Sequence, residues 1–217
     1  IYQGLKPFTI FRDRTFEKVY EFNNNLKFFN LNTSYRSTYE IIMFARELIK
    51  VNEPKDEYLP NPIERYGDKP LLIKRDSYKD IIEEIANMLS DDICNKNIAI
   101  ILRGEDKCKI FYNCLKDKID VNLIIKNTNE YNGGISIIPS NLTKGFELDE
   151  VIIPDADIYT YSDDDFDRNL FYIQVTRALH KLTLMYTGEI SPIIKNCSPE
   201  VYDIEETEYV TKVKLKT

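Results

Sequence analysis

One arginine stands where the sequence predicts an apolar residue. The segment 169–178 belongs to a predicted helix with apolar residues at Phe166, Leu170 and Ile173, and Arg177 continues that stripe at helical spacing. An arginine that continues a buried stripe must be paired with a carboxylate or must face an anion, because burying an unpaired charge is costly. Arg177 is therefore either half of a core ion pair or a group that binds an anionic ligand.

A second pair of residues suits phosphate recognition. Tyr35 and Arg36 stand directly before a predicted helix. The free N–H groups and the dipole at a helix amino terminus favour anions, and an arginine at that point adds a full positive charge. The simpler alternative is that Arg36 forms a surface salt bridge.

A third segment carries groups that fit phosphate and sugar oxygens. Thr143 and Lys144 can donate to phosphate oxygens, and Gly145 permits close approach of the backbone. Glu147 can accept a hydrogen bond from a sugar hydroxyl. Lys144 also has a simpler explanation as a solvated lysine, so the order of the three segments along the chain carries more weight than any one of them.

The elements that must position these residues alternate along the chain. The predicted strands are 26–31, 71–73, 98–102, 121–125, 135–138, 151–153 and 182–186, and the predicted helices are 38–50, 77–93, 107–118 and the one that contains 169–178. Strands that alternate with helices predict an α/β fold with a doubly wound parallel sheet. Because ligands of such sheets bind beyond the carboxyl ends of the strands, we expect all three segments at that edge.

Local signals refine the element ends. Ser37 and Glu40 have the spacing of a capping box before the helix 38–50, and Ser77 is expected to cap the helix 77–93. Alternation of apolar and lysine residues in the tail suggests a further, edge strand around 209–215.

Composition excludes several classes of protein. The chain has 217 residues, of which 43% are hydrophobic and 30% charged, which is typical of a globular domain. Its net charge of −7 gives no general attraction to nucleic acid, so a nucleic-acid role has to rest on a local surface. We find no run long and apolar enough to span a bilayer and no signal-peptide pattern, and we expect a cytoplasmic protein without membrane contact.

The cysteines and the single histidine do not suggest a metal site. The four cysteines form no C-x-x-C pair, and His180 has no metal-ligand spacing to any of them. We expect no metal bound by this chain itself and reduced, mostly buried cysteines. Because the chain starts at Ile1 without a methionine, we also expect it to be a fragment of a longer protein.

The three segments occur in the order of three helicase motifs. Tyr35-Arg36-Ser37-Thr38, then Thr143-Lys144-Gly145-Phe146-Glu147, then Phe171-Tyr172 with Val175-Thr176-Arg177-Ala178 resemble motifs IV, V and VI of superfamily 1 helicases of the UvrD/Rep type. The local sequences Ile138-Pro139-Ser140 and Leu170-Phe171-Tyr172 are most similar to the HelD-like, or helicase IV-like, branch, whose members associate with bacterial RNA polymerase. The resemblance covers about residues 26–190.

The resemblance implies a fold and a bipartite ATP site. The fold would be a RecA-like, mainly parallel sheet flanked by helices, the second RecA-like domain (2A) of a helicase. Arg36 and Arg177 would contact the γ-phosphate of ATP as arginine fingers. Tyr35 would stack on the adenine, Glu147 would bind the ribose, and the motif V loop would be ordered by Lys144 and Gly145.

The same resemblance implies partners. Thr143 and Thr176 would be supporting contacts on nucleic acid. The partners would be an N-terminal RecA-like domain of the same protein, DNA, and RNA polymerase. ATP with Mg²⁺ would be held mainly by that N-terminal domain. We expect residues 1–25 to be the tail of the preceding domain, residues 26–190 to form domain 2A, and residues 191–217 to be a C-terminal extension.

The chain also departs from the pattern. It contains no G-x-x-x-x-G-K-[ST] segment and hence no P-loop of its own, so it should not hydrolyse ATP alone. Asn141 and Leu142 replace the histidine that many members carry before the motif V lysine, which weakens the expected contact with nucleic acid. The alternative function is a non-catalytic protein-interaction module whose helicase motifs are degenerate. A stand-alone nucleotide-binding domain fits less well, because no glycine-rich loop follows the first strand.

Overall fold

The fold is a parallel seven-stranded sheet with helices on both faces. The computed structural model describes residues 33–50, 59–90, 96–126, 128 and 133–205. The strand order is β5-β6-β4-β7-β8-β3-β9, and every pair of neighbours is parallel. The strands are β3 (Leu71–Arg75), β4 (Ile98–Leu102), β5 (Asn122–Leu123), β6 (Ile135–Pro139), β7 (Leu148–Ile153), β8 (Ala178–Thr187) and β9 (Asp203–Ile204). The predicted α/β fold with a parallel sheet is confirmed.

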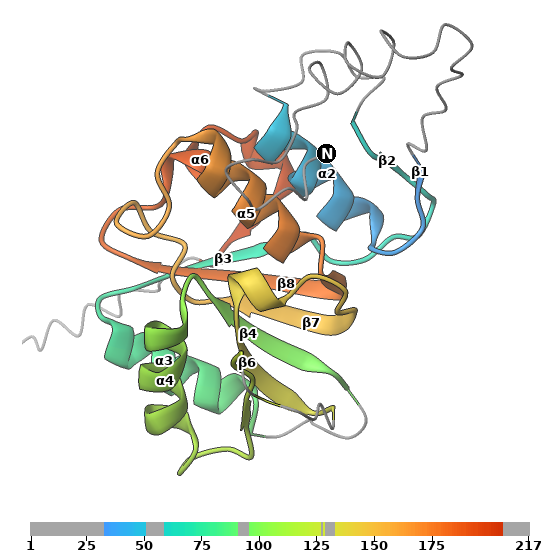
Figure 1. The fold of residues 1–217 in the computed structure, drawn as a ribbon. Helices are drawn as coiled ribbons and strands as arrows, with labels where there is room; N and C mark the ends of the chain where they lie inside the picture. The colour runs from blue at the N-terminus through green and yellow to red at the C-terminus, as the bar shows by residue number, and fades with distance from the viewer. Residues whose placement is uncertain (1–32, 51–58, 91–95, 127, 129–132, 206–217) are drawn as a thin grey trace, which may run out of the picture.

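The helices form two layers (Figure 1). In that view one layer lies above the sheet and the other lies below it. The upper layer consists of α2 (Tyr39–Ile49), α5 (Asp165–Val175) and the short α6 (Pro192–Lys195). The lower layer consists of α3 (Tyr78–Met88) and α4 (Glu105–Leu115).

Each helix layer covers its own hydrophobic core. Strand β4 is buried along its whole length, and its residues alternate between the two cores. Ala99 and Ile101 pack with α2 and α5, whereas Ile100 and Leu102 pack with α3 and α4. A strand buried on both faces has to be apolar throughout, which explains the uninterrupted run that identified it in the sequence.

Two short strands lie outside the main sheet. β1 (Thr33–Ser34) pairs in parallel with β2 (Asn61–Pro62). This pairing ties the segment before α2 to the chain that leads into β3. The sequence pattern between the predicted helix 38–50 and the predicted strand 71–73 did not indicate this pairing.

One predicted helix cap is present and one is not. Ser77 accepts a hydrogen bond from the N–H of Asp80, as expected for the cap of α3. The prediction of a capping box formed by Ser37 and Glu40 is wrong. Helix α2 starts after Thr38, and Thr38 makes no side-chain cap bond. The Ser37 hydroxyl instead donates to the carbonyl of Ala178 over 2.6 Å, and Glu40 accepts from the N–H of Gly67 over 2.7 Å. Partners distant in sequence have replaced the local ones.

The ends of the elements differ modestly from the sequence-based expectations. Strands β7 and β8 are longer than predicted, and α3 is described as ending at Met88. The predicted strand 26–31, the predicted edge strand around 209–215 and the tail 1–25 lie outside the described residues. The proposed domain boundaries stay predictions.

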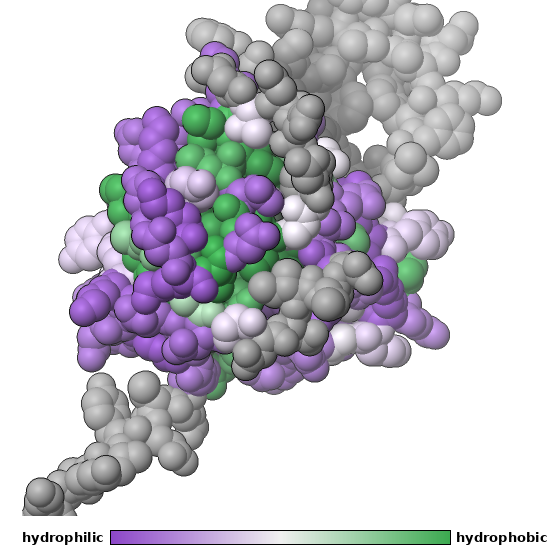
Figure 2. Space-filling model, turned by 90° about the horizontal axis from the view of Figure 1, so that it is seen from below, coloured by the Kyte–Doolittle hydropathy of each residue, from purple (hydrophilic) through white to green (hydrophobic). Residues whose placement is uncertain are grey.

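One face of the molecule is apolar at its centre. Figure 2 shows this face, on the side of α3 and α4, with a hydrophobic area bordered by hydrophilic side chains. A cavity of about 190 Å³ opens there between the two helices, lined by Tyr78, Ile82, Lys107, Ile110 and Phe111. Across the residues that the structure describes, no helix has the length and apolar character to cross a membrane.

Candidate functional site at the amino edge of the sheet

The three predicted segments meet at the amino edge of the sheet. Arg177 directly precedes β8, Glu147 directly precedes β7, and the N–H of Leu148 donates to the carbonyl of Arg177 over 3.1 Å. The segment before α2 joins them, since the N–H of Thr38 donates to the carbonyl of Leu179 over 3.2 Å. The expectation that these segments lie beyond the carboxyl ends is wrong for Arg36, Glu147 and Arg177. It holds for the start of the loop that leads to Glu147, since Pro139 is the last residue of β6 and Ser140 follows it.

The strand register explains the error. Pro139 at the end of β6 is level with Leu102, whereas Glu150 near the start of β7 is level with Ile98. The chain between β6 and β7 therefore leaves one edge of the sheet and returns to the other before β7 begins. Helix α5 makes the same return before β8. Glu147 and Arg177 each lie at the end of a connection that has returned to the amino edge, directly before the next strand.

Arg177 is buried and held by neutral groups. Its side chain is among the largest that are fully buried, with 2% of the residue exposed. Nε donates to the carbonyl of Ile173 over 3.1 Å, and Nη1 donates to the carbonyl of Phe146 over 3.3 Å. Ile173 lies in the last turn of α5, where the helix dipole favours a cation. Burial, and after it the charge of Arg36, lower the pKa of Arg177, although arginine keeps its proton.

The core ion pair that the sequence left open for Arg177 is not formed. Within the described part of the chain, no carboxylate makes an ion pair with it. The apolar stripe that leads to Arg177 is also shifted from the one predicted, because Phe166 is 47% exposed and the buried residues are Leu170, Phe171 and Ile173.

Arg36 and Glu147 form the exposed part of the site. Arg36 Nη2 lies 2.7 Å from Glu147 Oε1, and the two side chains are 38% and 55% exposed. The surface salt bridge considered for Arg36 therefore exists, and its partner is a residue of the same predicted site. Tyr35 is 73% exposed beside it, with its ring open to solvent. The structure thus places Arg36 against Glu147 and close to Arg177, and the roles expected for these residues stay predictions.

Residues 143–145 divide into exposed and structural ones. Lys144 and Gly145 are exposed. Gly145 has a φ of +97°, a backbone conformation that other residues adopt only under strain. Thr143 is buried, and its hydroxyl donates to the carbonyl of Ser140 over 2.7 Å. It holds the turn that presents Lys144.

The two threonines expected to contact nucleic acid donate to backbone in this structure. Besides Thr143, Thr176 donates through its hydroxyl to the carbonyl of Tyr172 over 2.9 Å at the end of α5. Both hydroxyls therefore have structural partners. Their role on nucleic acid stays a prediction.

A residue that the sequence did not single out also belongs to the site. Arg65 Nη1 donates to the carbonyl of Arg36 over 2.9 Å, and the N–H of Tyr39 donates to the carbonyl of Arg65 over 2.7 Å. The segment around Arg65 has no helical or strand periodicity, so only the run Arg65-Tyr66-Gly67 was available as a signal.

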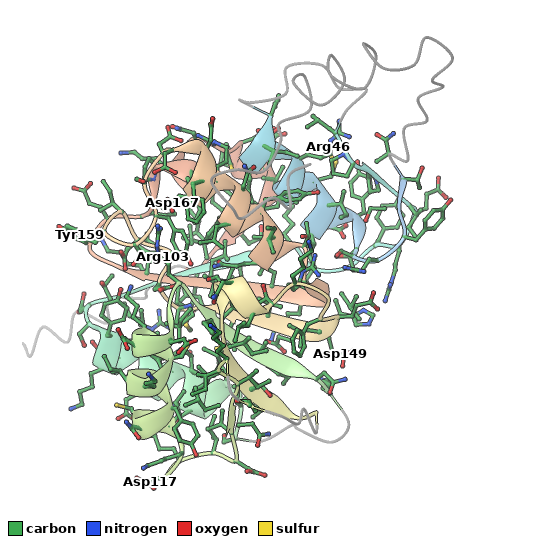
Figure 3. All side chains as sticks on the ribbon, in the orientation of Figure 1. Arg46, Arg103, Asp117, Asp149, Tyr159 and Asp167 are labelled. Carbon is green, nitrogen blue, oxygen red and sulfur yellow. The ribbon has the colours of Figure 1, made fainter. Side chains whose placement is uncertain are left out.

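A second polar cluster lies at the carboxyl edge. Asp155 follows β7 and is fully buried, and it accepts from Lys107 Nζ and from the N–H of Arg103, both over 3.2 Å. Arg103 Nη1 also lies 2.5 Å from a carboxylate oxygen of Asp167, which is buried. Burial raises the pKa of Asp155, which the ammonium of Lys107 opposes. In Figure 3, Arg103 and Asp167 lie at one edge of the sheet and Asp149, near the start of β7, lies at the other.

The arrangement of sheet and helices defines the class of the domain. A mostly parallel seven-stranded sheet with helices on both faces is the fold of RecA-like helicase domains. Within the described ranges, no group of three or more His, Cys, Asp or Glu residues is placed to hold a metal ion. No family model matches the chain, and no curated protein matches it.

Solved structures place the chain more narrowly. It is similar to the C-terminal domain of a possible DNA helicase from Lactobacillus plantarum WCFS1, with 28% identity and a TM-score of 0.66 over 80% of this chain and 99% of that one. Weaker matches are an Arterivirus nonstructural protein 10 (helicase) in complex with DNA, at 9% identity and a TM-score of 0.44, and S. cerevisiae Dbp5 bound to RNA and ADP BeF3, at 11% and 0.46. The chain thus resembles a helicase C-terminal domain along most of its length.

Proposed function

We propose that this chain is the C-terminal RecA-like half of an ATP-driven helicase or translocase of the UvrD-like superfamily 1. An N-terminal RecA-like domain of the same protein would supply the P-loop, and the cleft between the two domains would form the ATP site. Closing and opening of that cleft would move DNA or remodel RNA polymerase. The likeness to the C-terminal domain of a possible DNA helicase supports the class of protein.

The state of Arg177 carries this proposal. A buried guanidinium normally has a carboxylate partner, because its charge is costly to bury. Among the described residues, the hydrogen-bond partners of Arg177 are two backbone carbonyls, and Arg36 lies close enough to lower the pKa of Arg177. Two neighbouring arginines, of which only Arg36 pairs with the exposed Glu147, fit a polyanion such as a triphosphate chain.

Each residue of the cluster has a defined task under this proposal. Arg177 is held by the carbonyls of Ile173, at the end of α5, and of Phe146. Its side chain would therefore lose little conformational entropy on binding an anion. Arg36 is held at the surface by Glu147 and would exchange that carboxylate for a phosphate oxygen. Glu147 would then be free to accept from a ribose hydroxyl, and the exposed ring of Tyr35 would stack on a base.

The residues present fit ATP, although the described ranges contain no metal-ligand cluster. When bound, ATP with Mg²⁺ would supply the phosphoryl group whose transfer to water drives the domain movement. The arginines would stabilise the negative charge that develops on the transferred group. The metal ligands would belong to the N-terminal domain.

ATPase measurements on the full-length parent protein test the proposal. Arg177→Ala should lower kcat by about 10³-fold, the usual contribution of an arginine finger, without loss of the folded state. Arg75→Ala is a matched control, since Arg75 pairs with Glu84 and Glu205 at the other edge of the sheet. Full ATPase activity in Arg177→Ala would sink the assignment and would leave the non-catalytic interaction module as the better description.

The nucleic-acid and polymerase roles need separate measurements. Stimulation of the parent ATPase by single-stranded DNA, and separately by RNA polymerase, would identify which partner the cycle acts on. An ATPase that responds to neither would contradict both partner assignments while leaving the ATP site intact.

A further inference from the structure

The segment that runs from β2 to β3 is fastened along the loop that carries Tyr35 and Arg36. The two chains first pair as β1 and β2, with Ser34 opposite Pro62. Beyond that pair, the carbonyl of Arg65 accepts from the N–H of Tyr39 over 2.7 Å. The rings of Tyr39 and Tyr66 lie 5.4 Å apart. We call residues 61–67 the brace, since its two ends contact the loop and the first turn of α2.

The far end of the brace fits closely. The N–H of Gly67 donates to Glu40 Oε2 over 2.7 Å. A Cβ atom at Gly67 would lie 2.7 Å from Cγ2 of Thr38, which is closer than real contacts allow. Only glycine therefore lets the brace lie this near the start of α2. The contact of Glu40 with Gly67 also accounts for the missing capping box.

Arg65 is the only side chain of the brace with a described hydrogen bond to Arg36. Its Nη1 donates to the Arg36 carbonyl over 2.9 Å. Its Nη2 lies 3.0 Å from Nδ1 and 3.1 Å from Nε2 of His180, an exposed residue of β8. The planar guanidinium thus spans from the backbone of Arg36 to the sheet, which a lysine with one point of charge cannot do.

We propose that Arg65 is a positioning residue for Arg36, and this inference rests on the proposed ATP site. On the other side, Ser37 and Thr38 bind the carbonyls of Ala178 and Leu179. Arg65 secures the peptide between Arg36 and Ser37, so that the Arg36 side chain starts from a fixed point. Without Arg65, the exposed pair with Glu147 is the main described restraint on Arg36.

A double-mutant cycle in the full-length parent protein tests the proposal. Arg65→Ala should lower kcat for ATP hydrolysis by about 10-fold to 100-fold, the size of effect expected when a reacting group is displaced by about 1 Å. KM for ATP should change by less than about 3-fold, because Arg65 does not contact the nucleotide in this scheme. In the background of Arg36→Ala, Arg65→Ala should have no further effect on kcat.

Two further variants keep the test decisive. Arg65→Lys keeps the charge and the aliphatic stem but lacks the planar guanidinium. It should therefore lower kcat by nearly as much as Arg65→Ala does. It also serves if Arg65→Ala does not fold, as judged by thermal unfolding. Arg75→Ala should leave kcat unchanged, because its ion pairs lie at the carboxyl end of β3.

The outcomes separate this proposal from the function on which it rests. If Arg36→Ala leaves kcat intact, the proposed ATP site is wrong. If Arg36→Ala lowers kcat but Arg65→Ala does not, only the positioning role is wrong. An equal loss from Arg65→Ala in both backgrounds would show a general structural effect and would also overturn the positioning role, as would full activity of Arg65→Lys.

Discussion

The two edges of the sheet both collect cationic side chains, but they balance them differently. At the carboxyl edge, Arg103 and Lys107 are each matched to a buried carboxylate, Asp167 and Asp155. At the amino edge, the hydrogen bonds described for Arg177 go to two backbone carbonyls, and its neighbour Arg36 pairs with the exposed Glu147. The first set of charges is satisfied within the protein, whereas the second still offers positive charge to a ligand.

This difference reverses the usual expectation for such a sheet. Doubly wound sheets commonly bind ligands beyond the carboxyl ends of their strands. Here that edge is occupied by the protein's own ion pairs, and Tyr78 adds a hydrogen bond to Asp157 over 2.5 Å. The carboxyl-edge cluster is best understood as structural, whereas the amino-edge cluster is the one to which we assign the proposed ATP site.

The largest expected effect comes from removing one arginine at each edge. Arg103→Ala leaves Asp167 buried without its cation and should lower the free energy of unfolding by about 2–3 kcal/mol, below the range for a fully buried pair because Arg103 is partly exposed. Arg36→Ala should change it by less than about 0.5 kcal/mol, since its pair is exposed. Urea unfolding of the 217-residue chain measures both. Equal losses at the two edges would refute the contrast.

The next effect concerns one glycine at each edge. Gly145→Ser should destabilise the chain by about 1–2 kcal/mol, because the φ of +97° is unfavourable for a residue with a Cβ. No atom lies within 4 Å of the added Cβ, so the cost would come from the backbone alone. Gly104→Ser should instead raise stability by about a few tenths of a kcal/mol, since Gly104 caps α4 with φ −145°. The same unfolding assay checks both signs.

If both glycine variants lost stability equally, the amino edge would not depend on a special backbone conformation. If Gly145→Ser loses stability and Gly104→Ser does not, the turn at 143–145 depends on the positive φ of Gly145, and this turn presents Lys144. The amino edge would then depend on a special backbone conformation that the carboxyl edge does not need at Gly104.

Much of the fold could be predicted from periodicity. The uninterrupted apolar run 98–102 is β4, and alternation of strands and helices predicted the parallel sheet correctly. The sequence also singled out Arg177 as the residue that continues an apolar stripe, and the structure buries it, although Phe166 of that stripe is exposed. These predictions rest on local spacing, which governs which face of an element is covered.

The errors concern contacts between distant segments. Local spacing does not reveal whether a segment lies before or after the sheet edge has been crossed, so the edge of the site was assigned wrongly. Ser37 and Glu40 matched a capping pattern but bind Ala178 and Gly67, which are far away in the sequence. Arg65 left no periodic signal, because its importance comes from one carbonyl of another segment.

The smallest expected effect is a change in the slope of stability with pH at the carboxyl edge. Burial raises the pKa of Asp155, so the folded chain holds that proton more tightly than the unfolded chain. The resulting stabilisation is complete below the ordinary pKa of aspartate, about 3.9, and is lost as the pH rises through the raised pKa. Asp155→Asn removes this contribution, so the stability of the natural chain relative to the variant should fall with increasing pH.

Urea unfolding of both chains across the range from mildly acidic to neutral pH measures this difference. The slope should persist in about 1 M salt, because the penalty for burying a charge is not screened as an exposed ion pair is. A difference that grows with pH would mean that Lys107 stabilises the carboxylate more than burial disfavours it. The ion pair of Lys107 and Asp155 would then stabilise the fold, and the positive charge of Lys107 would be taken up within the protein, unlike that of Arg177.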